Sequence, residues 1–189
     1  MTKYEAFLLI HIVAVIVWLG AGTTLALTGL YAERRGDRML LGRIPLLGQW
    51  LGPRVFGPAA LLVLAMGFAL VDEGSWSYSM LWIDLGLTAF ALTLLTNFAV
   101  RLPLLRRLES VDGRGGPESP ETLGTTGRLL ALARLDLTIL FLAVGDMVVK
   151  PTSDDTWVLL AGALILLAGL VGALVARSRR ERLRPETAG

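Results

Sequence analysis

Long apolar runs separated by shorter charged segments dominate the pattern of this chain. Five runs are each near the ~20 residues that an α-helix needs to cross about 30 Å of hydrocarbon. They cover residues 6–32, 55–71, 80–100, 129–149 and 157–176. We therefore predict an all-α, polytopic integral membrane helix bundle, a single membrane domain over residues 1–189 with five transmembrane helices. The first run is far longer than the core of a signal peptide, so we expect it to remain as a helix.

Basic residues between the runs predict the orientation of the chain. Segments 33–54 and 101–128 and the tail from residue 177 hold five arginines each, whereas the alternate segments hold only Lys3 and Lys150. Cytoplasmic loops of membrane proteins keep an excess of lysine and arginine. The N terminus is therefore predicted to lie outside and the C terminus in the cytoplasm.

Two of the connecting segments have a distinct composition. Residues 39–51 interleave leucine, isoleucine and tryptophan with arginine, which is typical of an element at the membrane surface. Residues 109–127 are rich in Gly, Pro, Ser, Thr and Glu, and we predict a flexible cytoplasmic loop without regular structure there.

The overall composition excludes several classes of site. The 189 residues are 54% hydrophobic and 18% charged, and the basic residues form three blocks rather than one stripe, so the lipid bilayer is the expected partner and nucleic acid is not. The absence of cysteine excludes disulfides, thiolate metal sites and iron–sulfur clusters, and the single histidine excludes a site built from two imidazoles of one chain. No hydrolytic triad, phosphate-binding loop or zinc-protease motif is present.

Ionisable side chains inside the runs are the best candidates for a functional site, because each costs roughly 2.5–3.5 kcal/mol on insertion scales. A helical rise of about 1.5 Å per residue places four of them in the outer third of the bundle, with an indole nearby. This candidate polar site consists of His11, Trp18, Asp84, Asp146 and Lys150.

Several roles are open for these outer residues. His11 could form a hydrogen bond with Asp84, serve in a proton relay, or act as an axial ligand of haem b or copper, with Met80, Met147 or Lys150 as the second ligand. Asp146 and Lys150 are four residues apart, so an ion pair along one helix would neutralise both. No metal site is predicted apart from His11 in the haem or copper case.

A second, inner polar tier lies toward the arginine-rich side. Depth places Arg134 and Asp136 level with Asn97 and Arg101. Since charges within membranes tend to be paired, we expect this tier to orient the helices through ion pairs.

Small residues mark the last run as a packing surface. Gly162, Gly169 and Gly172 lie in it, and Gly169 and Ala173 have the small-x-x-x-small spacing that lets helices approach closely. The surface serves packing within the bundle or a homo-oligomer.

Short motifs spread over most of the chain resemble a bacterial family of predicted integral membrane proteins, domain of unknown function 2269. The likeness covers residues 4 to about 151, and the last run looks like an added helix. It rests on His11 to Gly20, Tyr31 to Asp37, Pro58 to Gly67, Trp82 and Asp146 to Pro151. The resemblance implies a membrane protein without an established activity.

A narrower likeness concerns the first run alone. His11, Trp18 and Gly20 are similar to the first helix of copper-resistance D-type proteins and of the haem-binding bacterial membrane protoporphyrinogen oxidase. The oxidase likeness implies a functional histidine and lysine, of which His11 fits by position, while Lys150 lies at the end of the fourth run.

The sequence thus predicts a multi-pass integral membrane protein of the bacterial plasma membrane, with no specific activity deducible. A haem- or copper-linked redox protein using His11 and a proton-coupled transporter of small solutes or ions are the alternatives.

Overall fold

The computed structural model describes the backbone of residues 1–182 and the side chains of residues 1–108 and 116–172. All regular structure in this part of the chain is helical, as predicted. The α-helices are α1 (Lys3–Arg35), α2 (Arg38–Leu51), α3 (Gly57–Glu73), α4 (Leu81–Thr96), α5 (Leu102–Gly115), α6 (Pro120–Val149) and α7 (Thr156–Arg182), and two π-helical turns are η1 (Gly52–Phe56) and η2 (Asn97–Arg101).

The π-helical turns join pairs of α-helices into continuous rods. Proline lies at the start of η1, of α3 and of α5. Because proline has no N–H to donate to the preceding turn, a local change to the wider π-helical hydrogen-bond pattern lets the rod continue through these positions. Residues 1–182 therefore form five rods: α1, α2–η1–α3, α4–η2–α5, α6 and α7.

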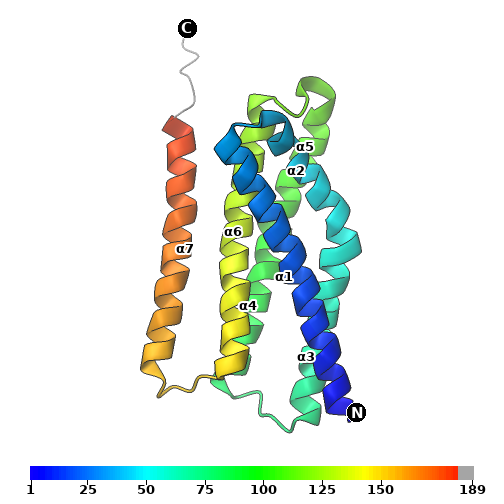
Figure 1. Ribbon diagram of the computed structural model, residues 1–189, viewed down its shortest axis with the longest axis vertical. Coiled ribbons are helices and arrows are strands. Elements are labelled where there is room, and N and C mark those ends of the chain that lie inside the picture. The colour runs from blue at the N-terminus through cyan, green and yellow to red at the C-terminus, as the bar shows by residue number, and fades with distance from the viewer. Residues whose placement is uncertain (183–189) are drawn as a thin grey trace.

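The five rods run along the long axis of the molecule and alternate in direction (Figure 1). One end, here called the N-terminal end, holds the start of α1 and the loops 74–80 and 150–155. The opposite, Arg-rich end holds the turns at 36–37 and 116–119 and the end of α7. Each predicted run lies within one rod.

Three of the helical stretches in the described residues are long and apolar enough to cross a membrane: Lys3–Arg35, Arg38–Glu73 and Leu81–Leu108. Helix α6 is long enough but carries Arg134, Asp136 and Asp146 within its apolar part. The described apolar part of α7, Thr156–Gly172, is shorter.

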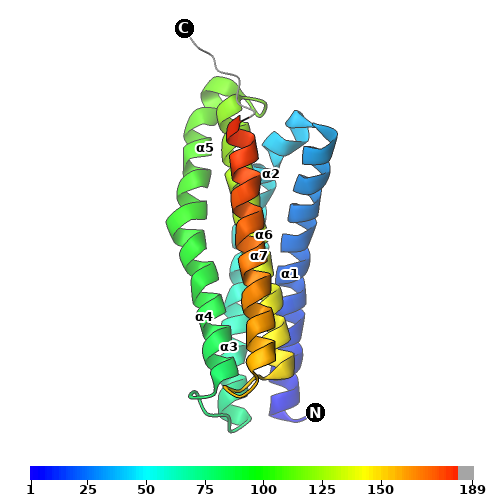
Figure 2. The same ribbon diagram turned by 90° about the vertical axis from the view of Figure 1, so that its left-hand side faces the viewer.

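Helix α6 lies at the centre of the bundle and packs against α1, α2, α4 and α7. Glycines of α1 permit a close antiparallel approach: a Cβ at Gly22 would lie 3.2 Å from Leu137, and Gly29 faces Leu130 one heptad further along. In contrast, α7 stands at the side of the bundle in front of α6 (Figure 2). Its Gly169 packs against Thr138 of α6, so this glycine serves packing within the chain.

Two predictions about connecting segments are wrong. Residues 39–51 are not a separate element at the membrane surface but belong to α2, which packs against α1 and α6. Residues 109–127 are not without structure, since α5 continues to Gly115 and α6 begins at Pro120.

The hydroxyl groups of the 109–127 segment explain the second error. Ser119 caps α6 by accepting a hydrogen bond from the Thr122 backbone N–H at 3.2 Å, and the Thr126 hydroxyl donates to the Thr122 carbonyl at 2.9 Å. Both threonines are buried. Side chains that look too polar for a core thus satisfy their hydrogen bonds within their own helix.

Candidate functional site

His11 is a buried histidine on the face of α1 that packs against α3. Its side chain is 6% exposed, and a Cβ at Gly67 of α3 would lie 3.6 Å from its Cε1 atom. The imidazole also lies next to the backbone of Val63 in α3. Its Nδ1 atom is buried and has no hydrogen-bond partner. Because Gly67 has no side chain, the imidazole ring fits between α1 and α3.

Asp146 is the second group without a partner. Both carboxylate oxygens are buried and neither accepts a hydrogen bond. The side chain lies beside Gly86 of α4, where a Cβ would be 3.9 Å from Oδ2. A polar group buried in this way costs free energy unless another species satisfies it.

These two groups lie at nearly the same height in the bundle. The contacts of Gly22 with Leu137 and of Gly29 with Leu130 set the antiparallel register of α1 and α6. Continued toward the N-terminal end, this register places His11 level with residue 148, within one helical turn of Asp146. His11 faces α3 and Asp146 faces α4.

Asp84 does not belong to this group, and the predicted His11–Asp84 hydrogen bond is wrong. Asp84 is exposed in the first turn of α4, while Ile83 and Gly86 form the buried face of the same helix. The two residues are at similar depth, but the Asp84 side chain lies on an exposed face of α4, whereas His11 is buried.

Lys150 ends α6 in the left-handed conformation, at φ 51°. Its Nζ atom lies 4.3 Å from the ring centroid of Trp76 and 5.3 Å from that of Trp82, and the two indoles meet edge to face. The predicted side-chain ion pair with Asp146 is therefore not formed. The left-handed residue ends the helix, and its ammonium group contacts two aromatic faces instead.

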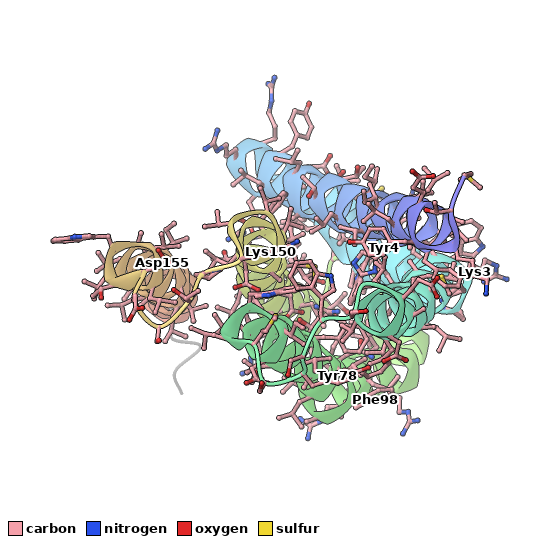
Figure 3. The ribbon with its side chains drawn as sticks, turned by 90° about the horizontal axis from the view of Figure 1, so that it is seen from below. Lys3, Tyr4, Tyr78, Phe98, Lys150 and Asp155 are labelled. Carbon is pink, nitrogen blue, oxygen red and sulfur yellow. The ribbon has the colours of Figure 1, made fainter. Side chains whose placement is uncertain are left out.

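An open pocket of about 530 Å³ lies next to this cluster. Its lining comes from the loops 74–80 and 150–155 and from the start of α4, and includes Trp76, Ser79, Met80, Trp82, Lys150, Thr152 and Ser153. Figure 3 looks onto this end of the bundle and shows Lys150 between the start of α1, marked by Tyr4, and Asp155 beside α7.

Asp155 holds the 150–155 loop in place. Its Oδ2 atom accepts hydrogen bonds from the Thr152 backbone N–H at 2.8 Å and from the Thr152 hydroxyl at 2.9 Å. These bonds lower the pKa of the Asp155 carboxyl group below its usual value. The loop therefore presents a fixed wall to the pocket.

Trp18 lies away from this end, in the middle of α1. Its ring meets Phe90 of α4 edge to face with the centroids 5.8 Å apart. This contact joins α1 to α4 and gives Trp18 a packing role.

The inner tier is built from ion pairs between helices. Arg101 of η2 forms a salt bridge and hydrogen bond with Asp136, whose Oδ1 atom also accepts a hydrogen bond from the Thr96 hydroxyl at 3.0 Å. Asn97 begins η2 next to Thr96. Helical depth predicts that Arg101 and Asp136 lie at one level, but it does not predict the hydrogen bond from Thr96.

Arg134 has a different partner, Glu33 of α1, at 2.6 Å. Sequence reasoning missed this pair because Glu33 follows the first apolar run and was counted with the connecting segment. The signal that could have found it is the lone carboxylate one residue beyond that run, at the same end of the bundle as Arg134.

The three candidate second ligands for a haem or copper at His11 lie in other surroundings than the histidine, and binding of either group stays a prediction. Met80 and Lys150 line the open pocket, whereas the His11 ring is enclosed by α3. Met147 packs against Gly86 of α4. Within the part of the chain that the structure describes, no group of three or more His, Cys, Asp or Glu side chains is placed to hold a metal ion.

Comparison with known proteins finds a family model that matches most of the chain. A model of a family described as predicted integral membrane proteins, domain of unknown function 2269, matches residues 5–151. No curated protein and no solved structure matches the chain. The matched region ends before α7, the helix at the side of the bundle. The chain therefore belongs to this family of predicted integral membrane proteins.

Proposed function

We propose that the protein spans the bacterial plasma membrane five times, with the N-terminal end of the bundle outside, and that it transports protons coupled to a small solute. Five rods of alternating direction and the gathering of arginine at one end support the topology. The observation that carries the transport proposal is the Asp146 carboxyl group, buried without a partner in a membrane helix.

A buried carboxylate in this position needs a proton or a cation to neutralise its charge. An ionised group in the membrane interior is costly unless it is paired, and intramembrane acids of this kind often form proton relays. Neither carboxylate oxygen of Asp146 has a hydrogen-bond partner, and the nearby ammonium of Lys150 lies on Trp76 and Trp82. A proton taken up from the N-terminal end would supply the missing partner.

Further polar groups extend from Asp146 toward the Arg-rich end. Asp136 lies ten residues along α6, about 15 Å away, in its cluster with Arg101 and Thr96. The Thr23 hydroxyl of α1 lies between His11 and the Arg-rich end, and it is buried without a hydrogen-bond partner. These groups would serve as steps for a proton between the two ends of the bundle.

Cysteine labelling tests the topology, since the chain contains no cysteine. A membrane-impermeant maleimide should label Ser77→Cys, in the 74–80 loop, in intact cells. It should label Glu118→Cys, in the 116–119 turn, only after lysis. Labelling of both in intact cells, or the reverse pattern, would contradict the proposed orientation.

Proton flux tests the role of Asp146. Proteoliposomes that contain the pH dye pyranine would be given a potassium diffusion potential, and the change in internal pH recorded. We expect wild-type protein to carry protons and Asp146→Asn to reduce the rate at least tenfold. Asp84→Asn is the matched control, because this carboxylate is exposed, and should transport like the wild type.

Two results would overturn the transport proposal. One is a wild-type rate equal to that of protein-free vesicles, both alone and across a panel of added small solutes. The other is an unchanged rate in Asp146→Asn.

A further inference from the structure

The pocket between the loops 74–80 and 150–155 is lined by the ammonium group of Lys150, whose charge is not neutralised by a described carboxylate. Lys150 forms no salt bridge with the carboxylates that the structure describes, and its ammonium makes no hydrogen bond to the described residues. The two indole faces attract the positive charge, but they leave its N–H donors available. A ligand with an acceptor oxygen could bind these donors directly.

The remainder of the pocket favours a ligand that is also partly apolar. Most of its lining surface is apolar, with Trp76, Met80 and Trp82 among the lining residues, and Ser79 and Ser153 contribute hydroxyl groups. Its volume, about 530 Å³, is within the range of roughly 300–1,000 Å³ that small-molecule sites occupy. Tryptophans at a helix end are typical of the lipid headgroup level of a membrane.

The acidic residues in and next to these loops form no salt bridge with the Lys150 ammonium, and two of them, Asp72 at the end of α3 and Asp155, have other partners. Asp72 accepts a hydrogen bond from the Tyr78 hydroxyl at 3.0 Å, and Asp155 accepts two from Thr152. Both carboxylates are thus bonded elsewhere in the loops.

We propose that this pocket binds the phosphate group of an amphiphile, with a phospholipid headgroup as its source, through the Lys150 ammonium and the faces of Trp76 and Trp82. The proposal goes beyond proton transport, because it requires no titration of Asp146. A free phosphate ester carries the same chemistry, so the test separates the two sources.

Tryptophan fluorescence of the full chain in detergent gives the readout, since two of its five tryptophans line the pocket. The probes are dihexanoyl-phosphatidylglycerol, dihexanoylglycerol and glycerol 3-phosphate. The two lipids are added below their critical micelle concentrations. We expect a saturable change with the phosphatidylglycerol and none with dihexanoylglycerol, which lacks the phosphate. Equal responses to these two lipids would overturn the phosphate site.

Variants link the response to Lys150. Lys150→Gln should weaken phosphatidylglycerol binding at least about tenfold, because it removes a charged hydrogen-bond donor. Lys150→Arg keeps the charge and should retain binding, which separates a lost contact from a misfolded pocket. Lys3→Gln, at the same end of the bundle (Figure 3), is the control and should bind like the wild type.

The remaining outcomes are also decisive. Glycerol 3-phosphate binding as tightly as the lipid would support the phosphate site and reject the lipid as its source. Absence of saturable binding by both phosphates, or binding unchanged in Lys150→Gln, would overturn the proposal. Asp146→Asn should bind phosphatidylglycerol normally, so failure of proton transport and failure of this site are distinguishable.

Discussion

Removal of Arg101 should destabilise the bundle by leaving a buried charge on α6 without its partner. Asp136 is 4% exposed and receives one hydrogen bond from Arg101 and one from Thr96. The variant Arg101→Met keeps much of the side-chain volume and removes the positive charge. It therefore isolates the ion pair from the packing around it.

The expected cost follows from the burial of the pair. Breaking a buried ion pair by removing one partner costs about 3–5 kcal/mol, whereas exposed pairs contribute less than about 1 kcal/mol. The Arg101 side chain is 28% exposed, so we expect a value near the lower limit, about 3 kcal/mol. The Thr96 hydroxyl has a single hydrogen, for which Asp136 and the Thr93 carbonyl compete, so Thr96→Val should cost only about 1.5 kcal/mol.

Unfolding by SDS in mixed micelles, followed by circular dichroism, measures these differences. The double variant Arg101→Met with Asp136→Leu should recover most of the loss, because it leaves no buried charge. Arg43→Met, at an exposed arginine of α2, is the control. If Arg101→Met cost no more than this control, or if the double variant cost as much as the sum of its parts, the ion pair would not be a stabilising element.

Two further predictions concern the loop 74–80 and the contact of α2 with the α5–α6 turn. Desolvation, the hydrogen bond to Asp72 and the charge of Asp72 raise the pKa of Tyr78. The contribution of Tyr78 to stability is therefore present at neutral pH and is lost as the pH rises through that pKa. Asp72→Asn should lower the pKa of Tyr78 in an ultraviolet titration, with Tyr78→Phe as the reference. Gly42 of α2 packs directly on the Pro117 backbone, so Gly42→Ala should cost about 1–3 kcal/mol, whereas Gly48→Ala, with open space around it, should be neutral or stabilising in thermal unfolding.

The order of helices and the depth of charged residues could be predicted from the sequence. Apolar runs of membrane length and the distribution of arginine carry that information, and each predicted run lies in one helical rod. The family resemblance over residues 4 to 151 is confirmed by the match to residues 5–151. A fixed rise per residue likewise brought Arg101 and Asp136 to one level.

The direction in which each side chain faces could not be predicted in the same way. Depth alone made His11 and Asp84 plausible partners, but contact also depends on which helices are neighbours. The structure places α1 against α3 and α6, while Asp84 occupies an exposed face of α4. The spacing of four residues predicts an ion pair between Lys150 and Asp146, yet Lys150 has a left-handed backbone and its ammonium lies on the Trp76 ring.

Composition was a poor guide for residues 109–127. Segments rich in glycine, serine and threonine are on average poorly ordered, so composition alone predicts a loop here. Here Ser119 caps a helix, and threonine hydroxyls bond to carbonyls of their own helix. Tertiary packing against α2 then stabilises a segment whose intrinsic preference is weak.

The central position of α6 has a consequence for biogenesis. Its apolar part carries three charges, and the partners of two of them, Glu33 and Arg101, belong to segments that the ribosome makes earlier. Translocon scales assign each unpaired charge a cost of roughly 2.5–3.5 kcal/mol at the membrane centre. In the proposed five-span topology, stable integration of α6 would therefore depend on the earlier helices being present in the bilayer, and assembly would follow the order of synthesis.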